Sequence, residues 1–153
     1  MALTAAAPSP SGLRDRTLFA GNAILGSYSQ ILFGRSRPVG ILLLLATAID
    51  LRMLFAGFAA VLLALGTARV LDLPSELTAS GLYGYNALLI GLGGAAFVES
   101  TPLAIGLFAV AVMASVLITA ALHSALGAQF NLPTLTLPFL AVFLVVTGTI
   151  PLA

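Results

Sequence analysis

The stretch "NLPTLTLPFL", Asn131 to Leu140, decides how this chain folds, because two prolines interrupt one of its most apolar regions. Pro133 and Pro138 lie five residues apart, with Thr134 and Thr136 between them. A proline has no backbone N–H to donate to the carbonyl four residues earlier. In hydrocarbon, an unpaired carbonyl is tolerated only where the backbone is buried in protein or lines a wet cavity. The stretch therefore predicts a row of acceptor oxygens along such a cavity.

The two prolines have different expected effects on the backbone. Pro138 leaves the carbonyl of Thr134 free if the helix runs through it. Pro133 either frees the carbonyl of Gln129 in the same way or occupies the first turn of a helix, where no partner is lost. Both prolines are expected to shape the backbone around a pore.

Helical spacing places Thr136 and Phe139 on one face, with Leu132 one turn before Thr136. This face presents a hydroxyl acceptor beside an aromatic ring. The alternative is a proline-kinked helix in which the threonine bonds its own backbone.

The composition indicates an integral membrane protein. Of the 153 residues, 60% are hydrophobic and 7% are charged, against about 25% charged residues in a typical soluble domain. The net charge of +1, without a basic run, argues against a nucleic-acid partner. There is no cysteine, and one histidine and five scattered acids leave little for a metal site. We expect no cofactor and, without a visible nucleophile–base pair, no enzyme activity.

Continuous apolar runs, bounded by charged residues, predict an all-α membrane fold. A spanning helix needs about 20 apolar residues, and 53–71, 102–126 and 132–150 satisfy this cleanly. We expect about five transmembrane helices plus one short re-entrant pore helix near the N-terminus, in a multi-pass protein of the cell (plasma or inner) membrane. The six runs are 17–33, 38–49, 53–71, 77–98, 102–126 and 132–150.

The chain divides into a flexible arm at 1–16, rich in small residues and proline, and a single transmembrane domain at 17–153. The charges mark the edges of the apolar runs, and almost none lies at membrane depth. Proton- and sodium-driven transporters usually carry ionisable groups at membrane depth. Their absence here argues against a pump.

Two further segments pair a polar residue with an aromatic one. "YSQILFGRS" places Gln30 and Phe33 three residues apart, and "GLYGYNALLIGLGG" does the same for Tyr83 and Asn86. The second segment is rich in glycine, which lets backbones approach closely. The alternatives are that Gln30 and Asn86 hydrogen-bond between helices and that the glycines serve packing alone.

These three segments together resemble the urea transporter family. "LPTLTLPF", Leu132 to Phe139, matches that family's LPxxTxPF signature at every fixed position. "GLYGYNALLIGL" resembles the family's stretch around a Gly-Tyr-Asn core, and "SQILF" resembles its pore helix. The resemblance covers about residues 18–150.

The resemblance implies a passive, selective urea channel embedded in the lipid bilayer. Family members have two homologous halves of inverted orientation, a pore between the halves with aromatic slots and a ladder of oxygens, and a trimeric assembly. Phe33 and Tyr83 would match slot aromatics, Gln30 a polar group at the pore mouth and Thr136 the hydroxyl at the constriction. Tyr83 stands where phenylalanine is more usual, which makes that slot less apolar. The expected pore and urea-binding residues are Gln30, Phe33, Tyr83, Asn86, Leu132, Thr136 and Phe139, with Pro133 and Pro138 shaping the pore.

The chain carries one such motif and is about half the family's usual length. It is one half of an inverted-repeat channel, and it either pairs with a second copy, pairs with a different half, or is a fragment. If 17–34 crosses the membrane, three arginines lie on each side of it, as dual topology requires. If 17–34 is re-entrant, Arg52 lies on one side of the membrane and the other five arginines lie on the opposite side. We favour an antiparallel homodimer, within a higher trimer-like assembly, because the chain starts at a methionine and ends near the close of a span.

Two alternative functions remain open from the sequence. One is a channel for other small neutral solutes, such as short amides, ammonia or water. The other is a non-transporting membrane subunit or a fragment of a larger transporter.

Overall fold

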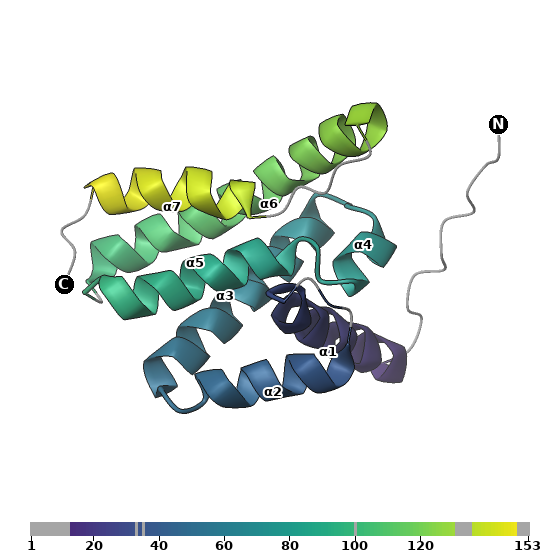
Figure 1. Cartoon of the computed structure of the whole chain (residues 1–153), viewed down its shortest axis with the longest axis horizontal. Helices are drawn as coiled ribbons and strands as arrows, with labels where there is room; N and C mark the ends of the chain where they lie inside the picture. Colours follow the sequence, from purple (N-terminus) through teal and green to yellow (C-terminus); the bar gives the residue numbers. More distant parts are fainter. Residues whose placement is uncertain (1–12, 33, 35, 100, 131–135, 150–153) are drawn as a thin grey trace.

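Charged residues and prolines separate the apolar runs, and most of the helices begin beside them, whereas one helix begins at Gly84, within an apolar run (Figure 1). The computed structural model describes residues 13–32, 34, 36–99, 101–130 and 136–149. Within these residues every regular element is an α-helix, which confirms the all-α class. The helices are α1 (Leu13–Gln30), α2 (Arg37–Thr47), α3 (Leu51–Val70), α4 (Ser75–Ala79), α5 (Gly84–Phe97), α6 (Pro102–Phe130) and α7 (Leu137–Thr149).

Two helices in the described part of the chain are long and apolar enough to cross a membrane. They are α3, with 20 residues, and the portion Pro102–Ala125 of α6, with 24 residues. At about 1.5 Å per residue, α3 is about 30 Å long, which is the thickness of the hydrocarbon core. Asp50 caps the start of α3, where its carboxylate accepts hydrogen bonds from the backbone N–H groups of Arg52 (2.8 Å) and Met53 (3.4 Å). The apolar runs at 53–71 and 102–126 therefore form helices of the length that a membrane span requires.

The apolar runs at 77–98 and 132–150 contain helices of about two thirds of the spanning length, α5 and α7, which are called half-length helices below. The first run is divided into α4, with 5 residues, and α5, with 14 residues. The turn between them contains Gly81, whose φ of +86° is a conformation that glycine adopts readily. In the second run the described helix α7 has 13 residues and begins at Leu137, so it is shorter than the predicted span. The number of crossings and the re-entrant helix remain predictions.

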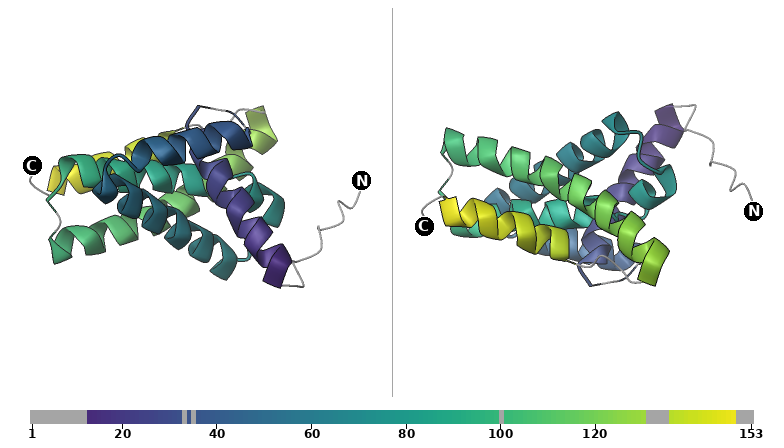
Figure 2. Two further views of the ribbon diagram at one scale, coloured as in Figure 1. Left: turned by 90° about the horizontal axis from the view of Figure 1, so that it is seen from below. Right: turned by 90° about the horizontal axis from the view of Figure 1, so that it is seen from above.

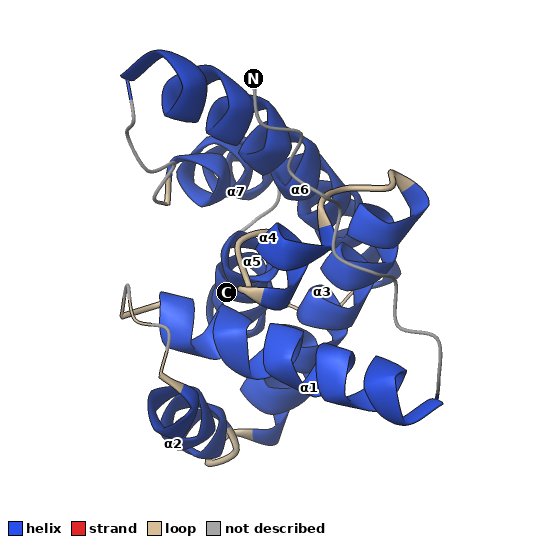
Figure 3. Ribbon diagram, turned by 90° about the vertical axis from the view of Figure 1, so that its right-hand side faces the viewer, coloured by secondary structure: helices blue, strands red, loops and turns tan. Residues whose placement is uncertain are grey.

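Helix α5 lies at the centre of the molecule. In Figure 1 and in both views of Figure 2, it lies among α1, α3, α6 and α7. Seen along the bundle, α1 and α2 lie on one side and α6 and α7 on the other (Figure 3). Close backbone approach accounts for Gly91 of α5, because a Cβ there would come within 2.6 Å of the carbonyl oxygen of Ala56 in α3. Gly93 and Gly94 of the same helix lie instead against the rings of Phe143 and Phe108, so these glycines serve packing.

Small side chains fill the interior, and large apolar side chains cover the outside. Ala64, Ala87 and Ala23 are fully buried, whereas Phe55 is 68% exposed and Leu144 is 66% exposed. A water-soluble monomer rarely exposes so much contiguous apolar surface, and membrane helices associate through small residues. This distribution of side chains is the one expected of a membrane protein.

Candidate functional site

The starts of α5 and α7 meet at one buried amide, that of Asn86. Its Oδ1 accepts a hydrogen bond from the backbone N–H of Phe139 at 3.3 Å, and its Nδ2 donates to the hydroxyl of Thr119 at 3.4 Å. Thr119 in turn donates to the carbonyl of Ser115 at 2.7 Å, within α6. Asn86 is 0% exposed. A single side chain therefore joins α5, α6 and α7.

The two half-length helices run in the same direction from this junction. Asn86 contacts the start of α7 at Phe139, and Gly93, two turns further along α5, lies against the ring of Phe143, one turn further along α7. Both N-termini therefore lie in the middle of the molecule, and both C-termini lie at the left end of Figure 1. The N-terminal end of a helix carries a partial positive charge and unpaired N–H groups. The junction thus brings two such ends together.

The structure changes the expected role of Pro138. Helix α7 begins at Leu137, and the carbonyl of Thr136 accepts the first helical hydrogen bond, from Leu140 (3.0 Å). Pro138 thus occupies the first turn, where its missing N–H costs nothing. Pro138 therefore does not interrupt a helix interior, and the groups left open at a helix start are N–H donors. Thr134 lies outside the described residues, so the free carbonyl expected there stays a prediction.

The start of α5 is held against the end of α1. The carbonyl of Gly81 accepts hydrogen bonds from the N–H groups of Gly84 and Tyr85, both at 3.1 Å. A Cβ at Gly84 would collide with the side chain of Ser27 in α1, so only glycine fits there. The side-chain amide of Gln30, the last residue of α1, donates to the carbonyl of Ser80 at 3.2 Å. The end of α1 is therefore tied to the turn before α5.

Five of the expected pore residues gather around these helix starts. Tyr83 (2% exposed) and Asn86 (0% exposed) are buried, whereas Gln30, Thr136 and Phe139 are partly exposed. Gln30 and Asn86 both hydrogen-bond between segments, which confirms the alternative that the sequence left open for them. The buried residues thus pack beneath the site, and the partly exposed residues form its surface.

The expected residues Phe33, Leu132 and Pro133 lie outside the described residues. Pro138, expected to shape the pore, is fully buried. These placements leave their roles in the pore as predictions.

A row of three aromatic rings extends from the site along α7. The rings of Phe139 and Phe143 have centroids 5.0 Å apart and planes 33° apart. Phe143 also contacts Phe108 of α6, at 6.3 Å and 59°. Sequence reasoning missed Phe143 and Thr119, although the four-residue spacing of Phe139 and Phe143 on a helix was a readable signal.

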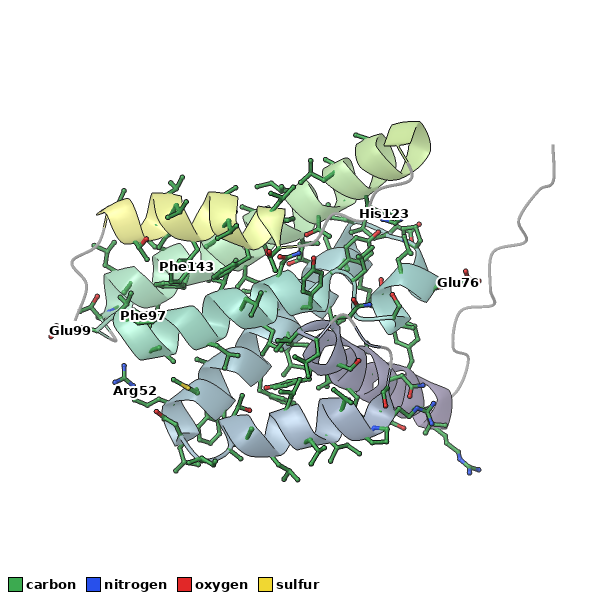
Figure 4. All side chains as sticks on the ribbon, viewed as in Figure 1. Arg52, Glu76, Phe97, Glu99, His123 and Phe143 are labelled. Carbon is green, nitrogen blue, oxygen red and sulfur yellow. The ribbon has the colours of Figure 1, made fainter. Side chains whose placement is uncertain are left out.

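The described residues contain no group of three or more histidine, cysteine or acidic side chains that would hold a metal ion. The acids that can be placed lie apart, at the ends of the molecule: Figure 4 shows Glu76 at one end and Glu99 at the other. The site is therefore made of neutral polar groups, aromatic rings and helix ends.

Half-length helices whose N-terminal ends meet at mid-depth are typical of membrane transport proteins. Residues 22–151 match the model of the urea transporter family, so the chain belongs to this family. It is a family of membrane channels and transporters rather than of enzymes. A comparison with individual curated proteins gave no match.

Proposed function

We propose that this chain forms a passive, selective urea channel in the cell membrane, and that two copies enclose its pore. The supporting observation is the junction at Asn86, where two half-length helices begin side by side in a chain of the urea transporter family. The transmembrane unit is residues 17–153, preceded by an arm at 1–16.

The surface of the site fits the chemistry of urea. Urea is flat and neutral, with four N–H donors and one carbonyl oxygen. The hydroxyl of Thr136 and the carbonyl of Ser80 offer acceptors to its N–H groups, and the helix ends face its carbonyl oxygen. The ring of Phe139 offers a flat apolar face to its plane. These contacts are weak and neutral, so a solute that enters is also released.

One chain supplies only one wall of the passage. Tyr83, Asn86 and Pro138 are packed in its interior, while the partly exposed site residues face outward and need a second surface opposite them. An antiparallel second copy supplies an identical surface and recreates the inverted repeat of a full-length family member. Phe33, Leu132 and Pro133 belong to this proposed pore by their place in the family motifs.

The function is tested by solute flux into proteoliposomes. Urea permeability is expected to exceed that of empty vesicles, with glycerol and acetamide measured alongside as competing small neutral solutes. Thr136→Val is expected to slow urea flux because it removes the hydroxyl at the constriction. The matched control is Thr147→Val, since Thr147 lies on α7, the helix that follows Thr136, and its hydroxyl donates to the carbonyl of Phe143 (2.8 Å). Urea permeability no higher than that of empty vesicles refutes the channel.

The antiparallel pairing is tested by labelling. The chain has no cysteine, so Glu76→Cys gives a single labelling site on an exposed residue. In an antiparallel pair, an impermeant maleimide added to intact cells reaches about half of the copies. Labelling of all or none of the chains contradicts the pairing and leaves the flux result intact.

A further inference from the structure

An open groove of about 430 Å³ lies between α3, α5 and α6, away from the junction at Asn86. Its walls consist largely of small apolar residues, among them Ala56, Ala59 and Gly91. Larger side chains such as Phe55 (68% exposed) and Ile105 (62% exposed) form its outer edges. The groove therefore opens on the outer, apolar surface of the molecule.

The charged residues of this groove are confined to one end. Arg52 and Glu99 are the charged members of its lining. They lie where α3 begins, where α5 ends and just before α6 begins (Figure 4). The guanidinium of Arg52 donates to the carbonyl of Val98 at 3.4 Å, which fixes it at this level. Because α3 and α6 are the two spanning helices, this end of the groove lies at a membrane–water interface.

The length of the groove along α3 equals the thickness of about one leaflet of the bilayer. Its lining extends along α3 from Arg52 to Leu63, and 11 residues at about 1.5 Å each span about 16 Å. Half of a hydrocarbon core of about 30 Å is about 15 Å. The groove thus begins at the charged interface and ends near the middle of the membrane.

We propose that this groove binds one zwitterionic phospholipid with a primary ammonium, of the phosphatidylethanolamine type. An acyl chain lies along the small residues, the phosphate lies beside Arg52 and the ammonium beside Glu99. The positive and negative groups of this headgroup match the two charges of the rim. The site is independent of urea passage, and it makes the lipid a bound component of the protein.

The shape of the groove favours an acyl chain over a helix from a second copy. A helix is about 10 Å wide with its side chains, and Phe55 and Ile105 at the outer edges would hold its backbone away from the small residues inside. A single acyl chain is narrow enough to enter.

The test is native mass spectrometry of the full chain, released from nanodiscs that contain equal amounts of phosphatidylethanolamine and phosphatidylglycerol. One retained lipid per chain is expected, with phosphatidylethanolamine favoured about 1.5- to 5-fold, the range of exposed ion pairs. Ala59→Phe, which fills the groove, is expected to remove the retained lipid. The matched control Ala141→Phe, at an exposed alanine on α7, is expected to keep it.

A second pair of variants tests the headgroup without altering the packing. Glu99→Gln is expected to bring the ratio of the two lipids close to one, and Glu76→Gln, at the opposite end of the molecule (Figure 4), to leave it unchanged. Equal retention of both lipids by the unmodified chain overturns the proposal. So does unchanged lipid retention in Ala59→Phe, or a loss of the dimer in place of the lipid, which would assign the groove to a second copy.

Discussion

Replacing Asn86 by leucine removes the link between the two half-length helices while keeping the number of side-chain heavy atoms and the branching at Cγ. The substitution deletes the acceptor for the Phe139 N–H (3.3 Å) and the donor to Thr119 (3.4 Å). Because Asn86 is 0% exposed, water does not replace these partners. The N–H of Phe139 then lies at the start of α7 without this acceptor.

Two estimates bound the expected loss of stability. Polar contacts between membrane helices contribute about 0.6 kcal/mol on average, so the two bonds together give about 1.2 kcal/mol. Leaving a buried donor without a partner costs about 1–3 kcal/mol. We therefore expect Asn86→Leu to lower the free energy of unfolding by about 1–3 kcal/mol. Urea flux should fall as well, because the start of α7 loses its anchor.

Reversible unfolding in mixed detergent micelles measures this difference. The control is Thr67→Val, since the hydroxyl of Thr67 donates to the carbonyl of Leu63 within its own helix (2.8 Å). That control should change stability by less than about 0.5 kcal/mol, as is usual away from buried networks.

A double-mutant cycle of Asn86→Leu with Thr119→Val separates the bond between α5 and α6 from the rest. We expect a coupling energy of about 0.5–1.5 kcal/mol, as found for residues that share a hydrogen bond. The reasoning is refuted if Asn86→Leu is no more destabilising than Thr67→Val. It is also refuted if the two mutations of the cycle are simply additive.

Three further substitutions test the packing and the helix ends, each by the same unfolding measurement. Gly93→Ala should destabilise by about 1–3 kcal/mol, because its Cβ would lie 2.6 Å from the ring of Phe143. The control Gly106→Ala, whose Cβ would have nothing within 4 Å, should be neutral or stabilising by up to about 1 kcal/mol. Equal effects of the two substitutions contradict the packing of Gly93 against Phe143. Gly81→Ala should cost at least about 1 kcal/mol because φ is +86° there, and a neutral result contradicts the turn between α4 and α5. Asp50→Ala should cost about 1 kcal/mol of stability because it removes the cap of α3. Asp50→Asn should keep most of that stability, since asparagine also caps helices. Equal losses in both variants contradict a capping role for Asp50.

The two spanning helices could be predicted from the sequence because local features define them. The run at 53–71 begins just after a capping aspartate, and the run at 102–126 begins at a proline. Each of these signals acts within one turn of its own helix. The helix ends therefore follow from neighbouring residues alone.

The half-length helices could not be predicted as such, because their starts depend on contacts distant in the sequence. Hydropathy describes 77–98 and 132–150 as continuous apolar runs. The start of α7 is held by Asn86, 53 residues before Phe139. No pattern within either run contains that contact.

The candidate site was located from its motifs, but the roles of its residues were not all predictable. The three-residue spacing between a polar and an aromatic residue indicated Asn86 and Thr136 as site residues. Thr119 lies in an apolar run without such a pattern, and only its contact with Asn86 makes it part of the site. Burial also separates residues that look alike in the sequence. Thus Asn86 is enclosed, while Gln30 is partly exposed.

The place of Pro138 is explained by what a helix start needs in an apolar environment. A helix start leaves up to four N–H groups without partners, which is costly in hydrocarbon. In α7, Pro138 removes one of them because it has no N–H, and Asn86 accepts another, from Phe139. We expect the N–H groups of Thr136 and Leu137 to be the remaining donors at this start. A urea carbonyl, with two lone pairs, accepts two hydrogen bonds, so under the proposed function these two donors would serve one passing solute at a time.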